Sequence, residues 1–442
     1  MRVLLVCHGY PPFGVAGVER LSAQTAEELT RRGHEVTVLT RRPSGAPPRP
    51  SLERETREGV PVVSISGGGT KFERFPDHEP ALERIFERML AEVVPDVVLI
   101  THLMHHSPGY VAIAQRWRIP VVLELHDFFA MCPRSHLQRR SRELCDGPEG
   151  GRACAEHCFA DQPDAELRWA LRAQSFAEAV RYADEVLAPS GLVADAFGPM
   201  RDPDSSPIQV VDDAVSPLGP VLRSKVRGEL HLVSIGVTVE HKGFHVVVDA
   251  LRRARLAASR YTIFGIALEP LAGALRDAAE QVPDLELRLF GRFSPPELPA
   301  LLADADALVV PSLVAETYSI AAREAFACGL PVIASRIGAL PDAIRPGENG
   351  WLFEPGDVFG LASLLRRLDS DRSLVRRAAN GIRPDDMTSV ASRTDRLETL
   401  LAGAVGRPSR HHGRPEETEM LRMREALGAA DSARGGPGAA GS

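Results

Sequence analysis

The chain has 442 residues, too many for one ordinary domain core, and its 44% hydrophobic and 25% charged residues are typical of globular proteins. Its formal net charge of −7 gives no long-range attraction for nucleic acid, which excludes nucleic-acid binding as a main function. No stretch reaches the roughly 18 apolar residues of a membrane-spanning helix. The opening "MRVLLVCH" is too short for a secretory signal, so we expect a cytoplasmic protein.

A βαβ unit is predicted at the start of the chain. An apolar strand over residues 3–6 leads through a glycine-containing loop over residues 9–17 into a helix over residues 18–31. Gly33 ends that helix, and a second strand over residues 35–39 follows.

Two sets of short apolar runs then indicate two parallel sheets. The first half continues with runs at residues 60–65, 96–100, 120–125, 185–188 and 208–211, mostly separated by helical stretches such as residues 80–94. After the proline- and glycine-bearing stretch "SPLGPVLRSKVRG", the pattern restarts with runs at residues 230–235, 261–264, 285–290, 307–310, 332–334 and 351–353. Buried parallel strands have this form.

We therefore predict an α/β protein with two doubly wound, Rossmann-like domains. The N-terminal domain is expected over residues 1–215, with a cysteine-rich insertion at residues 130–160, and the C-terminal domain over residues 216–382. A helix at residues 383–403, returning to the N-terminal domain, and a flexible tail at residues 404–442 complete the prediction. The tail ends in the low-complexity sequence "SARGGPGAAGS".

Two acidic residues, Glu316 and Glu324, lie eight positions apart across a predicted strand-to-helix turn. The strand at residues 307–310 ends in a loop that holds Glu316, and Ser319 is expected to cap a helix over residues 320–328. The free N–H groups of the first turn and the positive end of the helix dipole form an anion site. Because helical side chains lean toward the N-terminus, Glu324 can reach the same place.

A ligand that combines phosphate with sugar hydroxyls would satisfy this site, because a carboxylate accepts hydrogen bonds in pairs and suits a vicinal diol. A second helix start supports this interpretation, since the strand "LHLVSIG" leads through "VTVEHKG", which contains Lys242, into the helix "FHVVVDALRRA". Lys242 lies where doubly wound folds bind ligands and is a phosphate-binding candidate. Either motif alone is better explained by surface residues that complement a helix dipole. Together they favour a nucleotide-sugar site.

These motifs resemble those of the retaining glycosyltransferases of the GT-B group usually called family 4, over nearly the whole chain before the tail. Glu316 and Glu324 match the family's Glu-x7-Glu signature, which "FACGLPVIASRIGALPDAI" and "ENGWLF" follow. In the first half, "GYPPFGVAGVERLSAQTAEELTRRGHEVTVLT" is similar to the family's opening. "ELHDFF" is similar to the segment with its active-site histidine, here His126. The resemblance implies two domains that face a central cleft.

The resemblance also implies how a nucleoside-diphosphate sugar donor would bind. Glu324 would hold the ribose hydroxyls, Glu316 the transferred sugar and Lys242 the diphosphate. Backbone groups of three further residues would complete the diphosphate site: Tyr318, Ser319 and Ile320.

The remaining implied roles concern the base and the acceptor. Arg292, in the turn after Gly291, would contact the base, and Gly17 would face the cleft. His126 would line the acceptor side, so that His126, Glu316 and Lys242 carry the catalysis, without a required cofactor. The acceptor would be a glycan, a lipid-linked glycan or a small molecule. From the residues alone, His126 is better explained by hydrogen bonds within its turn, and three other histidines are interpreted as structural: His8, His105 and His106.

Two departures from the family pattern bear on activity. The family usually has an arginine where this chain has Val237, and losing one charge-assisted hydrogen bond of about 1.5–3 kcal/mol would weaken donor binding by roughly one to two powers of ten. Arg292 and Arg323 are the candidates to replace it. The second departure is "VVDDAVSP", which contains Asp212 and Asp213 where the family commonly has Asn-Gly and then Val-Asp.

Four of the six cysteines lie in the segment "CPRSHLQRRSRELCDGPEGGRACAEHCF": Cys132, Cys145, Cys154 and Cys158. In a reducing cytoplasm four clustered thiols are more often metal ligands than disulfides, so we favour a structural zinc over two disulfides or free thiols. Arginines of the same segment can attract anionic lipid head groups at a membrane surface, although a solvated loop is the simpler explanation: Arg134, Arg139, Arg140 and Arg142.

Four functions are therefore compared. A retaining glycosyltransferase is the leading hypothesis, and a GT-B-like sugar-nucleotide epimerase would share its donor cleft. A sugar-nucleotide-binding relative with weak catalysis would account for Val237 and the Asp212 to Ala214 stretch. A glycosidase with Glu316 and Glu324 as its acid pair leaves the anion-binding helix starts unexplained.

Overall fold

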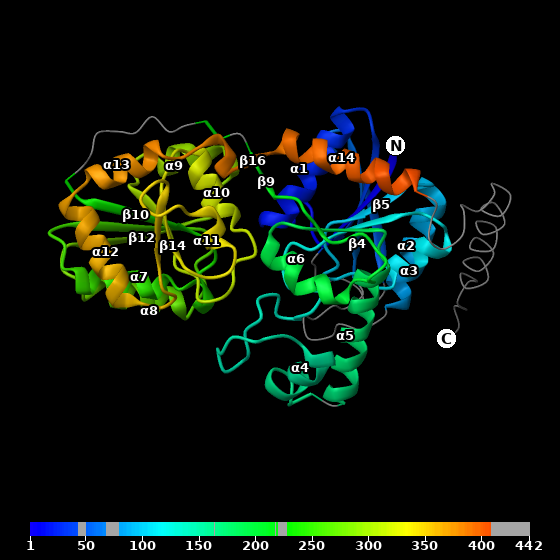
Figure 1. Cartoon of the computed structure of the whole chain (residues 1–442), viewed down its shortest axis with the longest axis horizontal. Coiled ribbons are helices and arrows are strands. Elements are labelled where there is room, and N and C mark those ends of the chain that lie inside the picture. Colours follow the sequence, from blue (N-terminus) through cyan, green and yellow to red (C-terminus); the bar gives the residue numbers. More distant parts are fainter. Residues whose placement is uncertain (43–49, 68–78, 163, 217, 220–227, 408–442) are drawn as a thin grey trace, which may run out of the picture.

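A computed structural model of the chain describes residues 1–42, 50–67, 79–162, 164–216, 218–219 and 228–407 (Figure 1). Two α/β units lie side by side in it, which confirms the predicted fold class. Most of "SPLGPVLRSKVRG" and the predicted tail from residue 408 onward lie outside the described residues. None of the helices in the described part of the chain combines the length and the hydropathy that crossing a bilayer requires.

The N-terminal unit is a sheet with helical crossovers and an insertion between β6 and β7. Its elements are β1 (Arg2–Cys7), α1 (Gly17–Arg31), β2 (Glu35–Arg42), β3 (Ser51–Arg57), β4 (Val60–Ser66), α2 (Pro80–Val93), β5 (Val97–Ile100), α3 (Tyr110–Arg116), β6 (Val121–Glu124), η1 (Glu149–Gly151), α4 (Arg152–His157), α5 (Ala165–Tyr182), β7 (Glu185–Ala188), α6 (Gly191–Phe197), η2 (Gly198–Met200) and β8 (Gln209–Val210).

The strand order of this sheet is β3-β4-β2-β1-β5-β6-β7-β8. β1 lies between β2 and β5, parallel to both, and Val3 to Val6 in it are fully buried. Strands buried on both faces account for the continuous apolar runs in the sequence. The edge strand β3 was not predicted. It runs antiparallel to β4, and its sequence "SLERETR" is mostly charged and exposed, so it carries no apolar signal.

The C-terminal unit has a six-stranded parallel sheet in the order β12-β11-β10-β13-β14-β15, with α7 and α8 on one side and α9 and α10 on the other (Figure 1). Its elements are β10 (Leu230–Ile235), η3 (Glu240–Lys242), α7 (Phe244–Ala254), β11 (Ser259–Phe264), α8 (Leu271–Glu280), β12 (Leu285–Gly291), η4 (Pro295–Glu297), α9 (Leu298–Leu302), β13 (Ala307–Val310), α10 (Ile320–Ala327), β14 (Val332–Ser335), α11 (Leu340–Ala343), β15 (Gly350–Phe353), α12 (Val358–Ser370), α13 (Ser373–Asn380) and η5 (Pro384–Asp386).

The chain crosses between the two units twice, and the two crossings pair with each other. β9 (Ala214–Val215) and β16 (Thr388–Ser389) form a short parallel pair. These strands therefore mark the hinge.

The order of the strands in the C-terminal sheet reverses at β10, which pairs with β11 on one side and with β13 on the other. Such a reversal opens a crevice at the carboxyl ends of the strands.

The last helix, α14 (Val390–Gly406), packs on the N-terminal unit (Figure 1). It starts at Val390 and not at residue 383, and it ends three residues beyond the predicted boundary at 403. The side chain of Ser389 caps it by accepting a hydrogen bond from the N–H of Ser392. Arg32 of the N-terminal unit contacts two acids of α14, Asp395 and Glu398, each at 2.6 Å. α14 thus closes the chain back onto its first domain.

Candidate active site

A cleft with a volume of about 410 Å³ lies between the two units. The N-terminal unit lines it with the start of α1 and the segment after β6, and the C-terminal unit with the loop after β13 and the start of α10. The cleft brings together eight of the predicted site residues, from positions up to 307 apart: Gly17, His126, Lys242, Glu316, Tyr318, Ser319, Ile320 and Glu324.

Lys242 and Glu316 form the first ion pair of the cleft. The Lys242 Nζ donates to Glu316 Oε1 at 2.7 Å, and the hydroxyl of Ser312 donates to the same oxygen. Burial favours the neutral form of Glu316, but Lys242 and Ser312 outweigh it, and the pKa of Glu316 is lowered. Glu316 is therefore an anion that accepts hydrogen bonds.

Two glycines allow this pair to form. Gly243, directly after Lys242, has φ = +69°, and a Cβ there would lie 2.0 Å from the carbonyl oxygen of Pro311. Gly338 has φ = +62°, and a Cβ there would lie 2.5 Å from the backbone nitrogen of Glu316. Only glycine allows these close backbone contacts. Gly243 brings the Lys242 turn against the loop after β13, and Gly338 brings the loop after β14 against Glu316.

Glu324 forms the second ion pair, and its partner comes from the opposite domain. Arg20 Nη1 lies 3.0 Å from Glu324 Oε1, and the Glu324 side chain is only 5% exposed. Burial raises the pKa of Glu324, although Arg20 lowers it in part. Sequence reasoning did not identify Arg20. It lies three residues after Gly17 in the predicted helix, so the helical periodicity was the available signal.

The starts of α1 and α10 meet across the cleft. A Cβ at Gly17 would lie 2.7 Å from Ile320 Cδ1, so the two helix ends are in contact there. Ser319 occupies the N-cap position of α10 with φ = +66°, but its side chain makes no capping hydrogen bond. The prediction that Ser319 caps the helix is therefore wrong. Without that side-chain cap, the first N–H groups of α10 stay available to an anion.

His126 lies between two buried carboxylates. Its Nε2 lies 2.8 Å from Glu124 and its Nδ1 lies 2.9 Å from Asp213, while all three side chains are at most 4% exposed. Burial lowers the pKa of His126, but Asp213 and Glu124 outweigh it and raise the pKa to about 10. The ring is thus held as a cation by Glu124, two residues earlier, and by Asp213, which lies outside the turn that the sequence suggested. Asp213, noted in the sequence only as a departure, supplies half of this arrangement.

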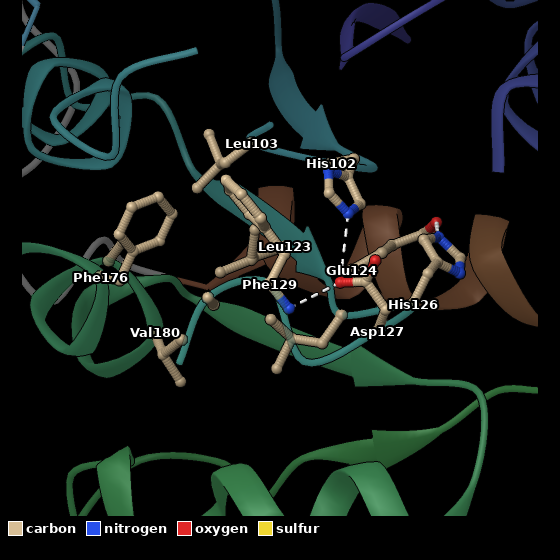
Figure 2. Close-up of a pocket in the computed structure, with 12 residues that line it drawn as sticks. His102, Leu103, Leu123, Glu124, His126, Asp127, Phe129, Phe176 and Val180 are labelled. Carbon is tan, nitrogen blue, oxygen red and sulfur yellow. Dashed lines mark hydrogen bonds and ion pairs between the residues drawn. The ribbon is translucent and has the colours of Figure 1, made fainter. Parts of the chain in front are cut away.

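Two further pairs line the N-terminal side of the cleft. The Met104 N–H donates to His102 Nδ1, so His102 Nε2 carries a proton and donates to Asp127 Oδ1 at 3.3 Å. Figure 2 shows His102 and the backbone N–H of Phe129 converging on that one oxygen of Asp127. His8 Nε2 lies 3.2 Å from Glu19, and both residues line the cleft. The interpretation of His8 as structural stays a prediction.

A hydrogen bond joins the two domains beside His126. The hydroxyl of Thr317, next to Glu316, donates to the backbone carbonyl of His126 at 2.7 Å. The loop that carries Glu316 thus lies directly against the segment after β6.

Two candidate residues are not among those that line the cleft. Arg292 is exposed and does not line it. Arg323 is buried with its guanidinium 4.4 Å from the centre of the Tyr318 ring, and it does not line the cleft either. Neither arginine therefore takes the place of the one expected at position 237 in this structure.

The cysteine-rich insertion lies beside the cleft. Cys132, Cys154 and Cys158 are buried, Cys145 is partly exposed, and all six cysteines are free. Burial raises the pKa of Cys154 to about 12, with smaller contributions from the other three thiols. Within the described residues, no group of three or more His, Cys, Asp or Glu side chains is arranged to hold a metal ion. The structural zinc stays a prediction, which metal analysis of the purified protein can test.

The same insertion contacts the Lys242 turn. Arg142 lies 2.6 Å from Glu240, and the ring of His136 stacks on that of His241 with centroids 4.6 Å apart. Arg139 and Arg140 pair with Glu143 and Asp161. These arginines are therefore engaged within the protein, which favours the solvated-loop interpretation over a lipid-binding one.

Comparisons with known proteins agree with this arrangement. The family described as "Glycosyl transferase 4-like domain" matches residues 16–212, and "Glycosyl transferases group 1" matches residues 229–371. A glycogen synthase from Mycobacterium tuberculosis is 27% identical over 402 residues, 87% of this chain and 89% of the relative. A D-inositol 3-phosphate glycosyltransferase from Corynebacterium glutamicum is 27% identical over 417 residues, 88% of this chain and 93% of the relative.

Among solved structures, HepE from Anabaena in complex with UDP superposes with a TM-score of 0.65 at 15% identity, covering 91% of this chain and all of that one. This likeness shows the fold. The two family matches together span well over half of the sequence, one on each domain, and the cleft between the domains holds the Glu-x7-Glu acids. The chain belongs to the group 1 glycosyltransferases and has the GT-B fold.

Proposed function

We propose that the enzyme transfers a sugar, with retained configuration, from a nucleoside-diphosphate sugar to an acceptor hydroxyl. One observation carries the proposal: Glu316 and Glu324 lie at the start of α10 in the interdomain cleft, each paired with a cation. Related folds support the donor class, since HepE is described in complex with UDP and with UDP-glucose.

In this proposal the departing diphosphate binds at the start of α10. Lys242 and the backbone N–H groups of Tyr318, Ser319 and Ile320 would neutralise the charge that develops as the bond to the sugar breaks. Glu324 would accept hydrogen bonds from the ribose, and Glu316 from the transferred sugar. Catalysis would then depend on leaving-group stabilisation and on positioning, without an obligatory enzyme nucleophile.

The acceptor would bind on the N-terminal side of the cleft. His126, held as a cation by Glu124 and Asp213, is proposed to act through charge and position, because both ring nitrogens are engaged. Asp127 uses one carboxylate oxygen for His102 and Phe129, and we propose that the other accepts a hydrogen bond from the acceptor hydroxyl. A glycan, a lipid-linked glycan and a small molecule all supply such a hydroxyl.

A sugar-nucleotide binder with weak catalysis is the second candidate, supported by Val237 at the position of the expected arginine. A screen of nucleotide sugars by thermal shift identifies the donor, since a ligand that binds the folded state raises the Tm. Release of nucleoside diphosphate that depends on an added acceptor, together with an α-configured product by NMR from an α-configured donor, supports the transferase. Binding without turnover for every acceptor class supports the binder, and a changed sugar without acceptor supports an epimerase.

We also propose a cytoplasmic location, supported by the six free thiols, since disulfides form mainly in oxidising compartments.

A further inference from the structure

The two acids of the Glu-x7-Glu signature each have a lysine or arginine as partner, and the two cations come from different domains. Lys242 of the C-terminal domain lies 2.7 Å from Glu316, and Arg20 of the N-terminal domain lies 3.0 Å from Glu324. Among the described residues that line the cleft, Arg20 and Lys242 are the only lysine or arginine side chains. Any anion that enters the cleft therefore meets these two charges.

The family pattern places an arginine beside the lysine at the diphosphate, and this chain has Val237 where that arginine is expected. Val237 leaves the Lys242 side of the cleft with one cation, and both Arg292 and Arg323 lie outside the lining. Arg20 is the second cation that lines the same cleft.

The geometry of Arg20 suits an exchange of partners. It lies in the first turn of α1, three residues after Gly17, where α1 touches Ile320 at the start of α10. Its guanidinium has five N–H donors, and its Nε is buried without a hydrogen-bond partner. Its side chain is 23% exposed, so it retains access to the cleft.

We propose that Arg20 is a donor-binding residue that moves from Glu324 to the diphosphate when the donor enters. The inference rests on the proposed donor class. The ribose hydroxyls donate hydrogen bonds to Glu324 and displace Arg20. The displaced guanidinium then pairs with the phosphate oxygens, because its planar set of N–H donors can form two parallel hydrogen bonds to phosphate. After the exchange Arg20 is in an ion pair with the phosphate, and Glu324 accepts hydrogen bonds from the ribose hydroxyls, so neither group is buried without a polar partner. Because Arg20 belongs to the N-terminal domain, the diphosphate would also bridge the two domains.

In the alternative role, which we call a lock, Arg20 competes with the ligand for Glu324. It then moves away when the ligand binds and makes no contact with the ligand. The two roles predict opposite effects on diphosphate affinity. A donor-binding Arg20 strengthens diphosphate binding, whereas a lock weakens the binding of every ligand that uses Glu324.

Isothermal titration calorimetry on the full chain separates them. UDP, ADP and GDP are titrated first, and the tightest is then compared with its own nucleoside in wild type, Arg20→Ala, Arg20→Gln and Arg20→Lys. We expect Arg20→Ala and Arg20→Gln to raise the Kd of the diphosphate by about 10- to 100-fold. We expect less than about 3-fold change for the nucleoside and partial recovery in Arg20→Lys. Arg31→Ala, on the same helix and 69% exposed, is the matched control and should leave both affinities unchanged.

Equal or tighter diphosphate binding by Arg20→Ala and Arg20→Gln overturns the inference and leaves the proposed function standing. An equal loss for nucleoside and diphosphate also overturns it, because Arg20 would then only order the Glu324 site. If the wild type binds none of the three diphosphates, the proposed donor class fails, and the inference fails with it. Thermal unfolding verifies that each variant is folded, and the neutral Arg20→Gln replaces Arg20→Ala if the latter is not.

Discussion

The guanidinium of Arg393 lies 2.7 Å from the carboxylate of Glu124, although the two residues are 269 positions apart. Both side chains are only 2% exposed. Glu124 uses its other oxygen to hold His126, so the last helix of the chain stabilises the N-terminal side of the cleft, where we propose that the acceptor binds. Arg393 also donates to Thr25 of α1 at 3.1 Å. α14 is therefore part of the support of the active site as well as a cover for the N-terminal unit.

Replacing Arg393 should unfold the N-terminal domain at lower denaturant concentration. Arg393→Ala leaves Glu124 buried without its cation, and breaking a buried pair in this way costs about 3–5 kcal/mol of unfolding free energy. Urea unfolding followed by tryptophan fluorescence measures the change. Arg396→Ala, exposed on the same helix, is the control and should change the unfolding free energy by less than about 0.5 kcal/mol. A similar stability for both variants would show that the Arg393 pair contributes nothing.

The pKa of His126 predicts a loss of stability at alkaline pH. Because its folded pKa is about 10 and its ordinary value is 6.5, the stabilising effect of its charge is complete below pH 6.5 and is lost as the pH rises toward 10. The unfolding free energy should fall over this range by up to about 1.4 kcal/mol per pH unit from this residue. His126→Gln cannot titrate, so its stability should depend less on pH between 7 and 10. Parallel profiles for wild type and variant would contradict the prediction.

Replacing Lys242 should slow sugar transfer, because Lys242 is proposed to stabilise the departing diphosphate. Lys242→Ala removes one charge-assisted contact, so acceptor-dependent release of nucleoside diphosphate should fall by about 10- to 100-fold. Arg252→Ala, exposed on the following helix α7, should retain full activity. The assay uses the donor identified by the thermal-shift screen. Unchanged turnover in Lys242→Ala would remove this residue from the proposed mechanism.

Gly243→Ala should lower stability and weaken donor binding, because the added methyl group collides with the backbone beside Lys242. The new Cβ would meet the carbonyl oxygen of Pro311 at 2.0 Å, in a left-handed conformation that alanine adopts only with strain. We expect a loss of about 1–3 kcal/mol in stability, with weaker donor binding because Lys242 moves from Glu316. Gly191→Ala, where a Cβ meets nothing within 4 Å, serves as the comparison. Wild-type affinity and stability in Gly243→Ala would show that the turn relaxes without cost.

The sequence alone determined the order of the elements in both domains and the position of the two acids. Buried parallel strands leave continuous apolar runs, and the glycines and helix periods between them are local features. For the same reason the exposed strand β3 was missed, because its charged residues carry no such run. The spacing of Glu316 and Glu324 is also a local feature. Eight positions, across one turn and the start of one helix, bring both side chains to the same end of that helix.

Only the tertiary structure decided which side chains complete the site. Arg20 meets Glu324, Asp213 meets His126, and Arg393 meets Glu124, each across a long stretch of sequence. No local pattern encodes these pairs, because they depend on how two sheets and a returning helix pack. The sequence placed the two acids and Lys242, and the packing of the two domains supplied Arg20, the cation beside Glu324.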